Sequence, residues 1–139
     1  MKTIPTILTL LLLCACQTPV LTLPGKQLKG IEATTPDFAF AARYKLLKLE
    51  VNPEKPYSVI LRCTVLDDEL YVDAAASRKW AIYLASDKRV RVKLGESVYD
   101  AIATAVTDRK ITERFLEGRT IYRLQPTATG EAVSEYPSQ

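Results

Sequence analysis

The residues that can carry chemistry in this chain do not include histidine, because none of its 139 residues is a histidine. This removes the commonest general base, any Ser-His-Asp or Cys-His arrangement, and most transition-metal sites. Carboxylates, Lys, Arg, Tyr, Ser, Thr, a thiol or a bound cofactor remain as the groups that any chemistry must use. We therefore expect no metal site.

Composition indicates one ordinary globular domain, since 47% of the residues are hydrophobic and 25% are charged. The net charge of +3 is too small to imply nucleic-acid binding by itself. We expect no nucleic-acid partner.

The N-terminal segment carries Cys16, which follows Lys2 and a short apolar run that ends in Cys14 and Ala15. That run is too short to span a bilayer and is typical of a secretory signal. The four residues that end at Cys16, Leu-Cys-Ala-Cys, resemble a bacterial lipobox, so we expect a lipoprotein signal peptide at 1–15 and fatty acylation of Cys16. Gln17 favours the periplasmic face of the outer membrane. The alternative is an ordinary signal peptide that is cut near Ala15 and leaves Cys16 free.

After this processing only Cys63 remains in the folded part of the chain. It cannot form a disulfide within the chain, and no cysteine metal site is possible. The run around it is rich in apolar residues, which favours a small buried core residue over a nucleophile.

The rest of the chain divides by composition into three parts. Residues 16–36 contain three prolines and two glycines and predict a flexible tether. Residues 37–126 carry the periodic patterns of a domain, and residues 127–139 form a polar tail. Residues 37–44 are compatible with one or two helical turns or with the lead into a strand.

Alternating apolar residues predict strands at 45–51 and 57–66, and a short third strand at 70–73. The polar turn at Asp67-Asp68-Glu69 joins the second and third strands as a hairpin. A short helix over 78–85 follows, with Ser77 as its N-cap.

The second half of the domain begins with a hairpin, in which strands at 89–94 and 97–106 meet at the turn Gly95-Glu96. A helix from Thr107, as N-cap, to about Glu117 and a final strand over 119–125 complete the pattern. The order β-β-β-α-β-β-α-β predicts a mostly antiparallel barrel or α+β sheet.

Several of these motifs resemble one known family. They are Trp80–Leu84, Asp87–Val92, Gly95, Val98–Ala101 and the helix start Val106-Thr107-Asp108. In this order they are similar to the deazaflavin-dependent nitroreductases, a group of the flavin-binding split β-barrels that also include the pyridoxamine phosphate oxidases. The resemblance covers about residues 45–125. It implies a mainly β (α+β) split β-barrel of antiparallel strands with two short helices.

The resemblance also implies FMN or a deazaflavin as cofactor, often held across a homodimer interface. The cofactor phosphate would lie near the loop before the aromatic helix, where Ser77, Arg78 and Lys79 offer a hydroxyl, two cations and a helix N-terminus. Trp80 completes this implied cofactor site. The alternative is a plain helix start with two solvated basic residues, with Trp80 as a core residue.

A second group of cations, Arg89, Arg91 and Lys93, lies on one face of a predicted strand. This stripe can meet a cofactor phosphate or an anionic membrane surface. A solvated sheet face is the simpler interpretation, and we prefer it.

These observations predict a periplasmic lipoprotein, anchored to the outer membrane through its N-terminal lipid, with a domain that resembles flavin- or deazaflavin-dependent reductases. Its reaction would be hydride transfer to a small acceptor, with the cofactor supplying the chemistry. The alternative is a non-catalytic ligand-binding or structural envelope lipoprotein that has lost the cofactor site. The glycine pair that the family carries in its phosphate loop is absent from residues 74–79.

Overall fold

The computed structural model describes residues 27–127, which form one curled β-sheet with short helices. The leader with Cys16 and the tail from residue 128 lie outside the described residues. The elements in chain order are β1 (Ile31–Ala33), η1 (a 3-10 helix, Ala39–Arg43), β2 (Leu46–Val51), β3 (Tyr57–Arg62), β4 (Thr64–Leu66), β5 (Glu69–Ala75), α1 (Lys79–Ser86), β6 (Arg89–Leu94), β7 (Ser97–Val106), α2 (Arg109–Thr112) and β8 (Arg119–Pro126).

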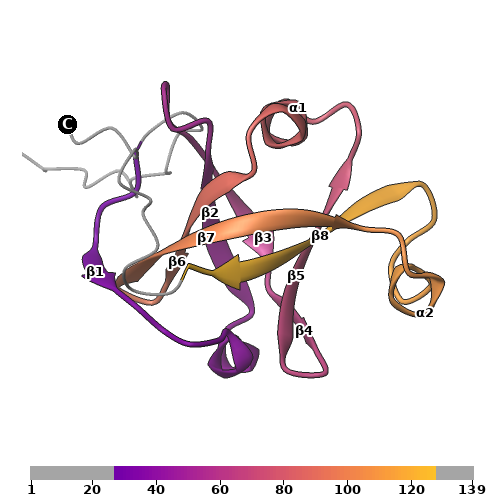
Figure 1. Ribbon diagram of the computed structural model, residues 1–139, viewed down its shortest axis with the longest axis horizontal. Helices are drawn as coiled ribbons and strands as arrows, with labels where there is room; N and C mark the ends of the chain where they lie inside the picture. Colours follow the sequence, from indigo (N-terminus) through magenta and orange to yellow (C-terminus); the bar gives the residue numbers. More distant parts are fainter. Residues whose placement is uncertain (1–26, 128–139) are drawn as a thin grey trace, which may run out of the picture.

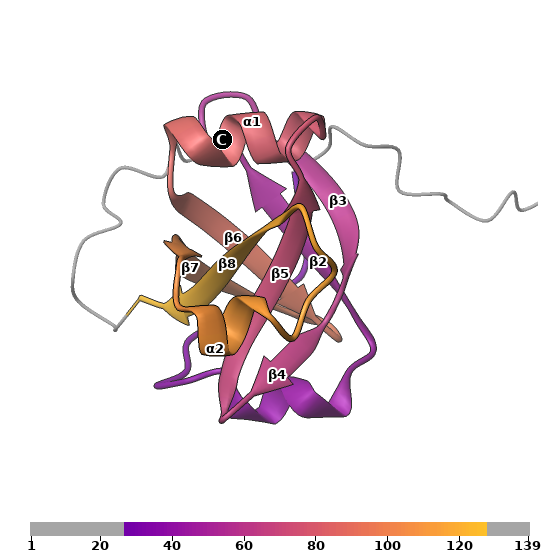
Figure 2. The same ribbon diagram turned by 90° about the vertical axis from the view of Figure 1, so that its right-hand side faces the viewer.

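The sheet has the strand order β3-β2-β6-β7-β8-β5-β4, and every neighbouring pair in this path is antiparallel. β1 lies off the path and pairs in parallel with the start of β7. The sheet curls into an incomplete barrel, with α1 across one end and η1 at the opposite end (Figures 1 and 2). The predicted split β-barrel of antiparallel strands with short helices is confirmed.

The core fills the inside of this barrel because the strands alternate between apolar and polar residues. On β6, Val90, Val92 and Leu94 are all buried, as their spacing predicts. β7 turns back at Gly95, whose φ of 59° is a left-handed conformation that glycine adopts without strain. The helix α1 closes its end of the barrel with a set of buried residues that consists of Trp80, Ala81 and Leu84.

The strand predicted over residues 57–66 is wrong in one respect, because the backbone turns a corner at Cys63. β3 pairs with β2 at one end of the strand order, whereas β4 pairs with β5 at the other end. The Cys63 amide donates to the Lys45 carbonyl at 2.9 Å, and its thiol contacts the Ala41 carbonyl at 3.2 Å. The predicted hairpin is therefore limited to β4 and β5, joined through Asp67 and Asp68 at positive φ.

Two predicted helices start or end elsewhere. α1 begins at Lys79 with Arg78 as its N-cap residue, so Ser77 is not the cap. The helix expected from Thr107 to Glu117 is much shorter, because α2 contains only the four residues Arg109–Thr112. Asp108 is its N-cap, and the Asp108 side chain accepts a hydrogen bond from the Lys110 amide. Propensity alone does not extend so short a helix, and α2 has no buried residue to hold it against the barrel. Residues 37–44, for which the sequence left two options, contain the 3-10 helix η1.

The domain begins before the predicted boundary at residue 37. Leu28 is only 4% exposed, and β1 adds its three residues to the edge of β7. Gly30 lies so close to the hairpin that a Cβ atom there would stand 2.6 Å from the Glu96 carbonyl oxygen. The part of the predicted tether from Leu28 to Ala33 is thus a strap packed on the sheet; we call it the N-terminal strap.

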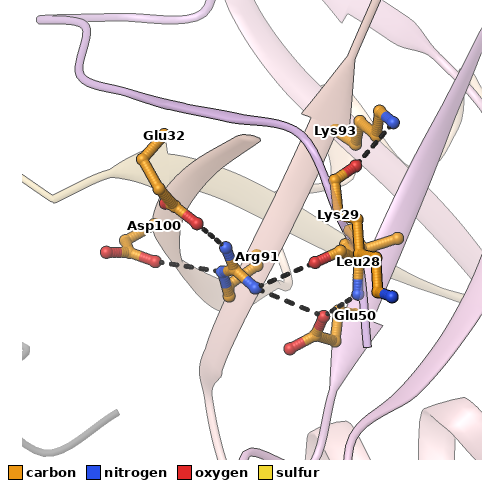
Figure 3. Close-up of polar contacts among 7 residues, drawn as sticks. All are labelled: Leu28, Lys29, Glu32, Glu50, Arg91, Lys93 and Asp100. Atoms are coloured by element: carbon orange, nitrogen blue, oxygen red, sulfur yellow. Dashed lines mark hydrogen bonds and ion pairs between the residues drawn. The ribbon is translucent and has the colours of Figure 1, made fainter. Parts of the chain in front are cut away.

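A buried arginine holds this strap in place (Figure 3). The Arg91 side chain on β6 is 7% exposed and lies 3.6 Å from the Glu50 carboxylate, which is fully buried. Its guanidinium also bonds to Glu32 and, at 3.4 Å, to the Leu28 carbonyl, while Asp100 lies 3.6 Å away. The Glu50 carboxylate in turn accepts a hydrogen bond from the Leu28 amide. Arg91 therefore joins the strap to strands β2, β6 and β7.

We expect replacement of Arg91 by Ala to lower the free energy of unfolding by about 3–5 kcal/mol, because the buried Glu50 carboxylate would lose the guanidinium that lies 3.6 Å from it. Urea unfolding followed by Trp80 fluorescence measures this change. Arg89→Ala is the matched control on the same strand, and its part-exposed ion pair with Asp87 predicts a loss of at most about 1 kcal/mol. Equal losses in the two variants would contradict a special role for Arg91.

The thiol at the barrel corner supplies a second prediction. Burial raises the pKa of the Cys63 thiol from 9.0 to about 11. The thiolate is the reactive form, so at pH 8 the native protein should react with iodoacetamide about 100-fold more slowly than the unfolded chain. Mass spectrometry of timed samples, with and without urea, measures the two rates. Equal rates would show that Cys63 is accessible and ionises normally.

Candidate functional site

A cavity of about 530 Å³ opens where the barrel is split, between β3 and β5 and beneath the start of α1. Among the described residues, β3 is paired along one side only, with β2. The part of β5 from Val72 to Ala75 is likewise paired only with β8, because β4 ends its pairing at Tyr71. Two strand edges therefore border the same opening.

The inner wall of this cavity is apolar and includes two aromatic rings, one from β3 and one from α1. Tyr57, Val59 and Leu61 come from β3, and their paired positions on β2 are core residues. Ala74 lies opposite on β5, where its small side chain leaves space, and Trp80 from α1 also lines the cavity. A flat, largely apolar group suits such walls.

The four residues predicted as a cofactor site all line this one cavity. Ser77, Arg78 and Lys79 are exposed at its rim, where the loop after β5 enters α1. Trp80 is only 5% exposed and belongs to the core, so it forms part of the wall. The structure thus brings the predicted residues together, and cofactor binding by them stays a prediction.

Lys79 is placed by two tyrosines that the sequence did not connect with it. Its ammonium nitrogen lies 5.1 Å from the Tyr57 ring centroid and 5.7 Å from that of Tyr83. The two rings are themselves 5.7 Å apart. Tyr83 follows Lys79 by one helical turn, a spacing that could have suggested this contact, whereas Tyr57 comes from a distant strand. The rings hold the ammonium at the rim through cation–π attraction.

An ion pair inside the cavity was also missed by the sequence reasoning. Arg119 on β8 donates from Nε to the Asp73 carboxylate on β5 at 2.7 Å and from a terminal nitrogen to the Asp73 carbonyl at 3.3 Å. Both side chains line the cavity. With Arg78 and Lys79, they give the cavity three cations and one carboxylate. The cavity therefore favours a ligand with a negatively charged group.

The basic stripe predicted on β6 does not belong to this site. Arg91 is buried beneath the N-terminal strap, and Lys93 donates to the Lys29 carbonyl at 2.6 Å (Figure 3). Arg89 pairs with Asp87 at 2.8 Å, and its hydrogen bonds lower the pKa of that carboxyl. The preferred expectation of a solvated face is wrong for Arg91, because residues far earlier in the chain cover it.

The described residues contain no helix long and apolar enough to cross a membrane. Among residues 27–127, no group of three or more acidic or cysteine side chains is arranged to hold a metal ion.

Comparison by sequence finds no matching family model and no similar curated protein. Comparison of folds gives clear matches. A Listeria innocua protein named "Putative Pyridoxamine 5'-phosphate oxidase" has a TM-score of 0.56 and 14% identity, over 65% of this chain and 90% of that one. General Stress Protein 26 from Bacillus anthracis has a TM-score of 0.55 and 15% identity, over 64% and 85%. A conserved hypothetical protein from Mycobacterium tuberculosis has a TM-score of 0.54 and 15% identity, over 74% and 86%.

At such low identities the matches show a shared fold. The similarity covers most of each matched chain, so it includes the barrel as a whole and not one hairpin. The narrower relationship to the deazaflavin-dependent nitroreductases stays a prediction from the sequence. The chain shares the split β-barrel fold of these solved proteins.

Proposed function

We propose that the domain binds a flavin-type cofactor, FMN or a deazaflavin, in the split cavity and serves as a reductase of a small electron acceptor. The observation that carries the proposal is the pairing of a cationic rim, at Arg78 and Lys79, with an apolar and aromatic wall in one cavity. A phosphorylated ring system has the same two parts, one anionic and one flat and apolar.

The residues present fit such a group. The cavity volume of about 530 Å³ lies within the range of about 300–1,000 Å³ that is usual for small-molecule sites. Arg78 and Lys79 supply charge for a phosphate, and Ser77 supplies a hydroxyl. The N-terminal residue of α1 carries no side-chain cap and no acidic residue follows in the first turn, so the helix dipole also favours an anion there.

The protein's own contribution would be binding and orientation. Ser77, Arg78 and Lys79 would fix the phosphate at the rim, and the walls formed by Tyr57 and Trp80 would exclude water from one side of the ring. The Asp73–Arg119 pair offers both an acceptor and donors to the polar edge of a ring. The cofactor, when bound, would supply hydride transfer. No histidine is needed for this division of labour.

We expect the chain to bind FMN or a deazaflavin, and the double variant Arg78→Ala/Lys79→Ala to bind it at least about tenfold more weakly. Each charge-assisted contact to a phosphate is worth about 1.5–3 kcal/mol, so the loss of two exceeds this threshold. Fluorescence titration of each cofactor measures the dissociation constants. Arg109→Ala/Lys110→Ala on α2 is the matched control, since it removes an adjacent Arg-Lys pair away from the cavity.

The alternative function, a ligand-binding or structural domain without a cofactor, makes the opposite prediction for this titration. A colourless protein that binds neither cofactor at high micromolar concentration would eliminate the reductase proposal. Equal weakening in the Arg109/Lys110 control would show that general positive charge is responsible, and the rim would then be a plain helix start.

We further propose that the chain is a lipoprotein, anchored through Cys16 on the periplasmic face of the outer membrane. The support is the short apolar leader and the Leu-Cys-Ala-Cys sequence that ends it. Cys16 lies outside the described residues, and the folded domain begins near Leu28.

Mass spectrometry of the N-terminus of the mature protein tests the anchor. We expect the chain to begin at Cys16 and to carry acyl groups on its sulfur and its amine, because several acyl chains are needed for durable anchoring. Cys16→Ser should abolish acylation and release the protein into the soluble fraction. An unmodified Cys16 in the mature chain would contradict the proposed anchor.

A further inference from the structure

One outer face of the barrel combines exposed apolar side chains with cations. In the antiparallel pairs, Leu46 lies opposite Arg62, and Lys48 lies opposite both Ile60 and Lys93. Side chains directly opposite each other share a face of the sheet. Leu46 is 60% exposed and Ile60 is 52% exposed. We call these five residues the basic apolar face.

This face is hollowed. A shallow cavity of about 280 Å³ is lined by Leu46, Lys48, Ile60 and Lys93, together with Glu96 at the β6–β7 turn. The face thus carries three cations and one nearby carboxylate around two exposed aliphatic side chains. Such a combination suits a surface that is both anionic and able to accept apolar groups, which describes the headgroup region of a membrane with acidic phospholipids.

The N-terminal strap ends its described course at this same face. The Leu28 amide donates a hydrogen bond of 2.5 Å to the carboxylate of Glu50. Glu50 lies two residues after Lys48 on β2. The Lys29 carbonyl accepts a hydrogen bond from Lys93 of the face itself (Figure 3). Because Leu28 is bound to Glu50 and Arg91, the chain that leads back to Cys16 leaves the domain near Glu50, on the same outer side of the sheet as Lys48 of the basic apolar face.

The length of that connection limits how far the domain can move from its anchor. Fully extended, the chain from Cys16 to Gln27 spans at most about 40 Å, and an unfolded segment is usually much shorter. The part of the barrel nearest the exit point is therefore held closest to the lipid.

A second copy of the chain is a poorer occupant of this face. In a symmetric dimer the same patch meets itself, so Lys48, Arg62 and Lys93 would face an identical set of cations. Like charges opposed in this way disfavour association, whereas acidic lipids neutralise them.

We propose that the basic apolar face docks on the anionic surface of the membrane to which the chain is anchored. The domain would then rest on the lipid with this face down instead of moving freely on its tether. This inference rests on the proposed anchor for its biological setting, but the affinity of the face for anionic lipid can be measured without the anchor.

The test uses the unlipidated chain that begins at Gln17, which keeps every buried core residue from Leu28 to Leu124. Sedimentation with vesicles of phosphatidylcholine, with and without phosphatidylglycerol, measures binding. We expect binding only to the vesicles that contain phosphatidylglycerol, and release at high salt because of charge screening. Leu46→Ser/Arg62→Glu should weaken this binding at least about tenfold, since it reverses one charge and removes one apolar contact.

Leu116→Ser/Arg114→Glu is the matched control, because it makes the same two changes at exposed positions after α2, at the end of the molecule opposite β1 (Figure 1). It should bind vesicles like the original chain. Thermal melts of both variants check that the fold is kept, and unchanged cofactor titration by Leu46→Ser/Arg62→Glu separates this proposal from the proposed cofactor site.

Three results would overturn the proposal. They are equal binding to neutral and anionic vesicles, equal loss in the two variants, and a dimer in light scattering that Leu46→Ser/Arg62→Glu dissociates. The last result would assign the face to a second copy of the chain.

Discussion

The structure depends on one change of partner in the backbone, at Cys63. Up to Arg62 the chain is hydrogen-bonded to β2, and from Thr64 it is hydrogen-bonded to β5, near the opposite end of the strand order. A strand cannot follow both partners around a strongly curled sheet, so β3 and the end of β5 separate. Among the described residues, the edges of β3 and of the end of β5 that pair with no further strand border the cavity, which lies beneath the start of α1. The corner thus creates the space in which a ligand can bind.

Arg91 and the pair Arg78 and Lys79 have different roles because they differ in exposure to water, although all three are cations. Arg91 is out of water and must be matched by carboxylates and a carbonyl, which makes it a structural residue. Arg78 and Lys79 stay in water at the rim of an apolar cavity, where their charge remains available. Lys79 is nevertheless held in position, since two tyrosine rings flank its ammonium group. Burial therefore separates the cations that support the fold from those that can bind an anion.

The cavity and the basic apolar face lie on opposite sides of β3, and Ile60 borders both. The cavity opens towards α1, at the barrel end opposite η1 (Figures 1 and 2). The N-terminal strap fixes where the chain leaves the barrel.

The sequence by itself determined the elements that depend on local pattern. Val90, Val92 and Leu94 alternate and face the core, Gly95 turns the hairpin, and Trp80 fixes the buried side of α1. The grouping of Ser77, Arg78 and Lys79 also follows from their adjacency. Only the tertiary structure decided the corner at residue 63 and the short α2. It alone brought Asp73 to Arg119 and Tyr57 to Lys79.

Tertiary structure also decided the N-terminal strap, which the sequence assigned to a flexible tether because residues 16–36 contain three prolines and two glycines. Arg91 and Leu28 are 63 positions apart, and no periodicity in the chain connects them. Local sequence patterns predict which side of a strand is apolar. They do not predict which distant residue will cover a charged side chain, because that depends on desolvation in the assembled barrel.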